Sequence, residues 1–223
     1  MIYTVAEIKH QVRVALDQNN SSTPLLNAGD IDTLTLDEII ESKIETAARI
    51  VTRDAAHYLL DGGKAFGESV GWNVREGYGS GYILLPTDFL RLVSFQMSDW
   101  SYPVTTAITE DDPLYALQQS RYGGVRGNPQ KPIVALSQQP IGLVLEFYSC
   151  TAGEGTSVKR ATYMPIPKIE YKTTDANDNE KEIEISEKLL PATIYYIAYL
   201  VALNIADVNM ATTLLNTSKD LMQ

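Results

Sequence analysis

The stretch Leu189–Ala206, LLPATIYYIAYLVALNIA, decides how this chain can fold. It runs for eighteen residues without a charge between Lys188 and Asp207, and fifteen of the eighteen are apolar or aromatic. The apolar residues are spread around the whole circumference of the helix that the stretch would form. A helix without a polar face must be covered on every side, which happens in a membrane, in a large core or between copies of the chain.

A membrane span is the first alternative. Eighteen helical residues rise roughly 27 Å, slightly less than the ~30 Å hydrocarbon core of a bilayer. However, Pro191, Thr193 and Asn204 interrupt the apolar run, three tyrosines lie in its middle, and neither flank carries a cluster of Lys and Arg. The favoured interpretation is a helix buried against its own domain and its neighbours. The alternative is a membrane-tethered module that uses residues 189–206.

Composition limits the class of protein. With 223 residues and 44% hydrophobic residues, the chain can form one or two domains with a real core. We expect no signal peptide, because the first residues lack a charged region. The single cysteine, Cys150, excludes an intramolecular disulfide framework, and its apolar surroundings predict a buried, inert thiol. The net charge of −10 argues against wrapping nucleic acid, although an acidic surface can surround a duplex without gripping it.

Capping boxes mark the starts of two helices near the beginning of the chain. In each box a threonine is followed three residues later by a glutamate, Thr4 with Glu7 and Thr35 with Glu38. Apolar residues then recur at helical spacing, and after the second box they do so for roughly six turns, as far as Leu59. The sequence therefore predicts a short helix and a long one before a glycine pair stops the pattern.

The middle of the chain has a different pattern. From about residue 64, glycine, tyrosine and proline separate short runs of β-forming residues, and the helical pattern returns after residue 186. The sequence predicts an α+β fold with a helical bundle formed by the N- and C-terminal helices, residues 1–63 and 187–223. An antiparallel β domain, residues 64–186, is expected as an insertion between them.

Few residues suggest chemistry. His10 and His57 are the only histidines, and neither has a partner at a metal-ligand spacing. The acidic triplet Glu110–Asp112 could hold a divalent ion or serve a carboxylate-based hydrolase, but a solvated turn before a helix is the favoured interpretation. We therefore expect no catalytic residue, no cofactor, no metal and no enzymatic activity.

The segment Gly81–Phe95, GYILLPTDFLRLVSF, carries a resemblance to a known family. It predicts a strand that ends at a proline, a tight turn, and a second strand. In these residues the chain resembles the head–tail connector adaptors of tailed bacteriophages, which include the tail tubular protein A type and the ring proteins beneath the portal of crAss-like phages. In that family a long helix precedes a strand that ends in L-P-x-D-F-x-R. The matching residues here are Leu85, Pro86, Asp88, Phe89 and Arg91.

Two further stretches resemble the same family. A G-x-P-x-x-P-like stretch of its strand-rich middle is matched by GNPQKP at 127–132, and its last helical segment opens with Leu-Pro, as at Leu190–Pro191. The resemblance covers most of the chain in order and spacing. Residues 153–160 and 175–182 have no counterpart that we assign.

The resemblance implies a structural protein of the virion that is made in the host cytoplasm. It implies a ring, commonly of twelve copies, which docks to the portal on one side and to a tail component or the next ring protein on the other. Double-stranded DNA would pass through the ring without sequence-specific binding, and no membrane would be involved. A different virion structural protein, such as a tail or capsid accessory subunit, is the alternative.

Contacts between copies and with the portal can be assigned to residues as expectations. In a ring each contact is heterologous, so an apolar helix face of one copy would be covered by a different face of the next. The residues expected to pack in the ring are Ile194, Ile197, Leu200, Val201 and Leu203. The amphipathic end of the chain, 211–223, is expected to dock to the portal through Leu214, Leu215, Leu221 and Met222.

Overall fold

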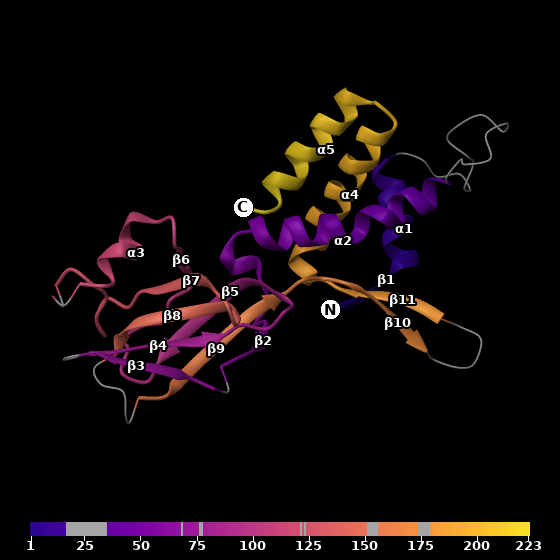
Figure 1. Cartoon of the computed structure of the whole chain (residues 1–223). Coiled ribbons are helices and arrows are strands. Elements are labelled where there is room, and N and C mark those ends of the chain that lie inside the picture. Colours follow the sequence, from indigo (N-terminus) through magenta and orange to yellow (C-terminus); the bar gives the residue numbers. More distant parts are fainter. Residues whose placement is uncertain are drawn as a thin grey trace. The chain divides into compact units, whose positions relative to one another are not determined.

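The computed structural model describes residues 1–16, 35–67, 69–75, 78–120, 122, 124–150, 156–173 and 179–223. These residues form five α-helices and three β-sheets, so the α+β class predicted from the sequence is confirmed. The chain divides into two compact units (Figure 1). The first unit comprises Met1–Asp61 and Ile166–Gln223, and the second comprises Gly62–Pro165.

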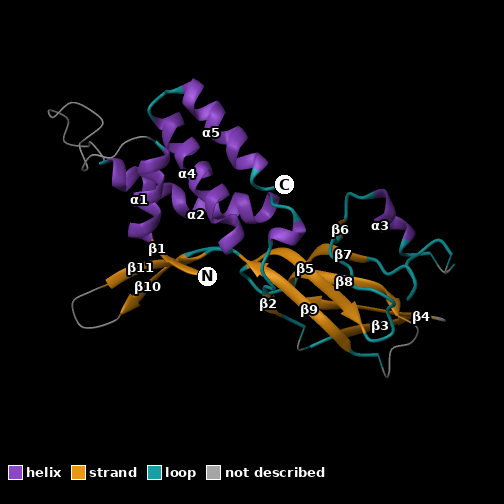
Figure 2. Cartoon of the chain, turned by 180° about the vertical axis from the view of Figure 1, so that it is seen from behind, coloured by secondary structure: helices purple, strands orange, loops and turns teal. Residues whose placement is uncertain are grey.

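The first unit combines four helices with a three-stranded antiparallel sheet, whose strand order is β1-β11-β10 (Figure 2). Its elements are β1 (Ile2–Thr4), α1 (Val5–Ala15), α2 (Leu36–Asp54), β10 (Ile169–Thr173), β11 (Asn179–Glu184), α4 (Leu190–Asn204) and α5 (Val208–Asp220), with 3-10 turns at His57–Leu59 and Glu187–Leu189. Residues 166–186, which the sequence assigned to the β domain, lie in this unit. The reason is that β11 pairs with β1 at the other end of the chain.

Local sequence signals explain where the helices of this unit begin. Both capping boxes form, and the Glu7 and Glu38 carboxylates each accept a hydrogen bond from the backbone N–H of their threonine. The helical pattern that was predicted to reach Leu59 is wrong in its last turn. The chain leaves helix α2 after Asp54, because Ala55 has an extended backbone with ψ 151°.

One apolar core joins the helices to the sheet of the first unit. Residues of α1, α2, α4 and α5 share this core with Ile183 and Ile185. The arrangement is visible in both views, where the sheet lies along one side of the helices (Figures 1 and 2). Helix α4 contributes residues to this core, so much of its apolar surface is covered within the unit.

The second unit is rich in strands. It contains a three-stranded sheet in the order β2-β9-β5 and a five-stranded sheet in the order β3-β4-β8-β7-β6. The elements are β2 (Lys64–Ala65), β3 (Gly71–Arg75), β4 (Tyr78–Leu84), β5 (Phe89–Met97), β6 (Ile108–Thr109), α3 (Pro113–Leu117), β7 (Val134–Gln139), β8 (Gly142–Cys150) and β9 (Val158–Pro165).

Aromatic side chains link the two sheets of the second unit. Phe95 of β5 and Phe147 of β8 are fully buried and stack with their ring centroids 6.0 Å apart. Cys150 is buried in the same core, as the sequence predicted. Of the segments without an assigned family counterpart, 153–155 and 175–178 lie outside the described residues, while 158–160 and 179–182 belong to β9 and β11.

Candidate functional site

Helix α4 is covered mainly by its own unit. Of the five residues predicted to pack between copies, Ile194, Ile197 and Val201 are buried against other residues of the first unit. Leu200 is partly buried, and only Leu203 is well exposed, at 44%. Buried side chains offer little surface to a neighbouring copy, so Leu203 is the member of this set with the most surface available, and packing of the five residues in a ring stays a prediction.

The end of the chain is also held in place. Leu214 and Met222 are buried, Leu215 is partly buried, and Leu221 is 39% exposed. The Met222 carbonyl accepts a hydrogen bond of 2.7 Å from the Ala56 N–H. These contacts leave only Leu215 and Leu221, of the four residues predicted to dock to a portal, with surface to offer a partner.

Further hydrogen bonds fix α5 to the rest of the first unit. The buried Ser218 hydroxyl donates to the Ala192 carbonyl of α4 over 2.8 Å. Just beyond the same end of α5, the Tyr58 hydroxyl donates to the Gln223 carbonyl. Helices α4 and α5 therefore behave as one packed hairpin.

This hairpin presents an almost uncharged surface. Residues 189–218 carry a single charge, Asp207, whose carboxylate accepts from the Met210 N–H over 3.0 Å and so caps α5. Near the connection between the helices, Leu203 and Val208 are 44% and 66% exposed. We call the exposed residues here the α4–α5 surface: Leu203, Asn204, Ala206, Asp207, Val208, Asn209 and Thr212.

The α4–α5 surface lies in the more acidic half of the molecule. The first unit contains 10 Lys and Arg against 19 Asp and Glu, which gives −9, whereas the second contains 8 against 9, which gives −1. The α4–α5 surface is partly apolar and carries one charged residue, Asp207, within an acidic unit. Depletion of charged residues is typical of the centre of protein–protein interfaces.

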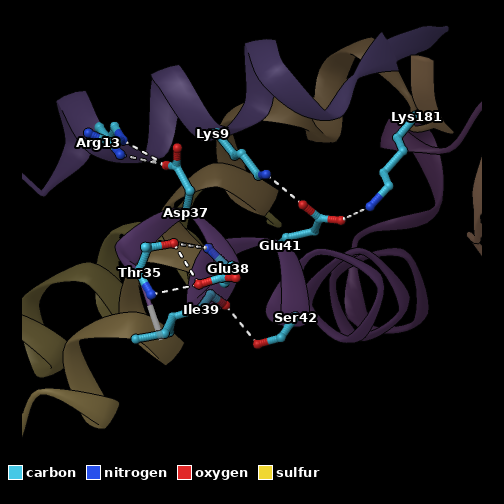
Figure 3. A network of polar contacts seen from close by, with 9 residues as sticks. All are labelled: Lys9, Arg13, Thr35, Asp37, Glu38, Ile39, Glu41, Ser42 and Lys181. Carbon is cyan, nitrogen blue, oxygen red and sulfur yellow. Dashed lines mark hydrogen bonds and ion pairs between the residues drawn. The ribbon is translucent and has the colours of Figure 1, made fainter. Parts of the chain in front are cut away.

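A polar network connects α1, α2 and β11 in the first unit (Figure 3). The Glu41 carboxylate of α2 accepts from Lys9 of α1 over 2.5 Å and from Lys181 of β11. One turn earlier on α2, Asp37 accepts from the Arg13 Nε over 2.8 Å. Hydrogen bonds from Lys181 and then Lys9 hold the pKa of Glu41 below its ordinary value.

Two open clefts lie beside this network. One, of about 610 Å³, contains Lys9, Arg13 and His10. The other, of about 580 Å³, runs between α2 and the edge of β10, and we call it the α2–β10 groove. It is lined by Glu38, Glu41, Ser42, Glu45, Thr46, Ile169, Tyr171 and Lys181. Sequence reasoning missed the network and the groove, because their residues come from segments far apart in the chain.

The family motif lies in the second unit and holds a turn. The Phe89 N–H donates to the Pro86 carbonyl over 3.0 Å, which closes the turn between β4 and β5. The Asp88 carboxylate accepts from the Tyr163 hydroxyl over 2.8 Å, and the Phe89 ring stacks on Tyr163 at 5.8 Å. Burial, and then the bond to Asp88, raise the pKa of Tyr163 to about 12.

The two remaining motif residues lie in the core and in a strand of the second unit. Leu85 is buried in the core of the second unit, and Arg91 lies in β5 opposite Met164 of β9. All five residues of the motif therefore belong to one stretch of chain that sets the path from β4 into β5. Packing accounts for Leu85 and Phe89, and hydrogen bonding accounts for Asp88.

A second polar network, centred on the Glu146 carboxylate, connects α3 to the sheet. The Glu146 carboxylate of β8 accepts from Gln139 of β7 over 2.9 Å, from Tyr115 of α3 over 3.2 Å and from Tyr148. Burial is the main cause that raises the pKa of Tyr148, followed by its bond to Glu146. Glu146 thus fastens the short helix α3 to the sheet. No pattern in the sequence indicated this.

The acidic triplet forms a turn, as the sequence predicted. Asp112 caps α3 by accepting from the Leu114 N–H over 2.8 Å, and Glu110 accepts from the Ser137 hydroxyl over 2.6 Å. Within the described residues, no group of three or more His, Cys, Asp or Glu side chains is arranged to hold a metal ion. Across the same residues, no helix combines the length and apolar character needed to cross a bilayer.

No protein-family model and no curated protein matches this chain.

Proposed function

We propose that this chain is a structural subunit of the head–tail connector of a tailed phage. In this proposal it forms an adaptor ring beneath the portal and extends the DNA channel toward the tail. The proposal includes the finer fold description, a bundle of terminal helices with an inserted β domain. It draws on the resemblance carried by Leu85, Pro86, Asp88, Phe89 and Arg91.

The α4–α5 surface is the observation that carries this proposal. An exposed leucine and valine, Leu203 and Val208, lie on a surface whose one charged residue is Asp207, in a unit whose net charge is −9. An isolated subunit gains nothing from leaving such residues in water, whereas a contact between subunits removes them from it. In a closed ring this surface would face a different surface of the next copy.

The proposed contacts differ from those expected from the sequence alone. Of the five residues predicted to pack in the ring, the proposal keeps Leu203. It adds Val208, which is more exposed than Leu203. Of the four residues predicted to dock to the portal, Leu215 of α5 and Leu221, which follows the helix, have surface available. Burying Leu203 and Val208 would contribute about 1 kcal/mol or more each, before the entropy of association is subtracted.

The charge of the molecule fits a passage for DNA better than a binding site for it. A protein that holds the phosphates of a duplex needs a basic surface, because each phosphate contact comes from Lys, Arg or a similar donor. A first unit of −9 repels phosphates and would let a duplex move past. We propose a closed ring, with twelve copies as the family suggests.

The test is assembly of purified protein with portal-bearing heads from the same phage, observed by electron microscopy and native mass spectrometry. The double variant Leu203→Asp with Val208→Asp places two charges on the α4–α5 surface and should abolish the ring. Val14→Asp is the control, because Val14 is an apolar residue on α1 of the same unit whose exposure, 55%, lies between those of Leu203 and Val208. Normal rings from the double variant, with an unchanged circular dichroism spectrum, would remove the proposal.

A further inference from the structure

Strand β10 forms one edge of the sheet in the first unit, since the strand order is β1-β11-β10. The Ile169 N–H donates to the Glu45 carboxylate of α2 over 2.8 Å, so it points away from β11. In an antiparallel ladder the backbone groups of every second residue point to the same side. The N–H and C=O of Tyr171 therefore also point out of the sheet, toward the side on which α2 lies.

The α2–β10 groove lies along this edge. Its volume is about 580 Å³, its floor includes Ile169 and Tyr171 of β10, and its wall is formed by side chains of α2. Tyr171 is 66% exposed, so its ring is available to a bound segment. An edge strand beside a groove can pair with an extended peptide, which then adds a further strand to the sheet.

Glu45 occupies the position of one acceptor of such a peptide. Its carboxylate oxygen stands where the carbonyl oxygen of a pairing strand would stand, opposite the Ile169 N–H. The next outward-pointing donor along the edge belongs to Tyr171. An incoming strand could begin its pairing there and continue the line of acceptors that Glu45 starts.

The charged residues that line the groove and the nearby sheet face indicate the charge of its occupant. The groove is lined by Glu38, Glu41 and Glu45. Lys181 in the groove and Lys9 beside it both pair with Glu41, which leaves one negative charge in excess. On the opposite face of the sheet, Glu170 of β10 stands directly across from Glu182 of β11. Lys172 of β10 already pairs with Glu182 over 3.0 Å. With Glu180 and Glu184, this face still carries four carboxylates against that one cation, so it also gains from a further cation. Side chains of an added strand alternate between these two acidic faces.

We propose that the α2–β10 groove binds an extended segment of another protein that carries Lys or Arg, by addition of a strand to β10. The longest polar segment of the chain itself, residues 17–34, contains three aspartates and no Lys or Arg, which is the wrong charge for this groove. A partner of different sequence therefore fits better than a second copy. The proposal depends on the first unit alone and is independent of the ring.

The probe is a fluorescein-labelled peptide of alternating lysine and valine residues, titrated with the full chain and measured by fluorescence anisotropy. A peptide of alternating glutamate and valine is the control for charge. We expect the lysine peptide to bind at least about tenfold more tightly than the glutamate peptide, and to weaken as salt is added. Equal affinity for the two peptides would overturn the assignment of a basic occupant.

Two variants at one position separate strand addition from simple charge attraction. Tyr171→Pro removes the outward N–H and obstructs the edge without removing a ladder hydrogen bond, and Tyr171→Thr keeps the N–H while losing the same ring. Proline should weaken the lysine peptide about tenfold relative to threonine, with both variants folded by circular dichroism. Equal binding by the two variants would refute strand addition. Self-association that Tyr171→Pro alone abolishes would make the occupant a second copy and overturn the proposal.

Discussion

Replacement of Ile197 by alanine tests whether helix α4 is covered by its own unit. Ile197 lies in the middle of α4, and none of its side chain is exposed. Truncating a buried isoleucine to alanine costs about 2–5 kcal/mol, from the lost transfer free energy and the cavity that remains. Because core side chains from several elements enclose this site, we expect about 3 kcal/mol. Leu203→Ala, on the exposed part of the same helix, should cost less than about 1 kcal/mol.

Urea unfolding followed by far-ultraviolet circular dichroism measures this loss, because four of the five described helices belong to the first unit. Both tryptophans, Trp72 and Trp100, lie in the second unit, so their fluorescence provides a reference from the same sample. With an m value of about 2 kcal/mol/M, a loss of about 3 kcal/mol lowers the midpoint by about 1.5 M. Equally small shifts for Ile197→Ala and Leu203→Ala would refute the reasoning, since α4 would then lack its cover within the unit.

Three other substitutions or reactions test the sites described above. Glu41→Gln leaves Lys9 and Lys181 without their carboxylate and should lower the free energy of unfolding by about 1 kcal/mol near neutral pH. The folded-state pKa of Glu41 is below its ordinary 4.5, so the free energy of unfolding of the wild type should fall as pH drops from 4.5 through that lower pKa. Denaturation of both proteins across the same pH series should show that Glu41→Gln lacks this part of the pH dependence. Glu146→Ala leaves three hydrogen-bond donors without their acceptor and should lower the stability seen by tryptophan fluorescence by about 2 kcal/mol, whereas an unchanged transition would contradict the role of Glu146 in fastening α3. Burial raises the pKa of Cys150 to about 12, so a thiol reagent at about pH 8 should react slowly with the folded protein and fully once denaturant is added; rapid native reaction would contradict the burial of this thiol.

Local signals predicted the parts of the fold that depend on neighbouring residues. The capping boxes at Thr4 and Thr35 start helices because a side chain satisfies backbone donors only three residues away. The end of α2 was misplaced because its apolar spacing continues to Leu59, although the backbone has already left the helix at Ala55. Spacing shows which residues share a face, but it does not show whether the chain keeps its helical dihedral angles.

The extent of each unit depended on contacts that the local pattern does not contain. Strands β10 and β11 follow the β-rich segment in the sequence, so they were assigned to it. They belong to the first unit because β11 pairs with β1, more than 170 residues earlier in the chain. Pairing partners of a strand are set by register and burial in the folded state, which a single sequence does not specify.

The candidate site shows the same division. The uncharged run 189–206 predicted a helix that must be covered on all sides. The structure has helix α4 within this run, with Ile197 and Val201 buried. Composition alone could not tell whether that cover comes from the same unit or from another copy, because burial by either removes the same apolar surface from water. The Glu41 network and the α2–β10 groove were not predictable, since each joins residues from three separate segments.

The amino-acid sequence by itself determined the mixed fold class, the starts of the helices, the need to bury α4 and the acidic charge, because each follows from neighbouring residues or from composition. Only the tertiary structure decided which face of α4 is left exposed, at Leu203, and which strand edge stands open beside α2, at Tyr171. Those outcomes depend on which distant elements pack together, and packing is a property of the whole unit.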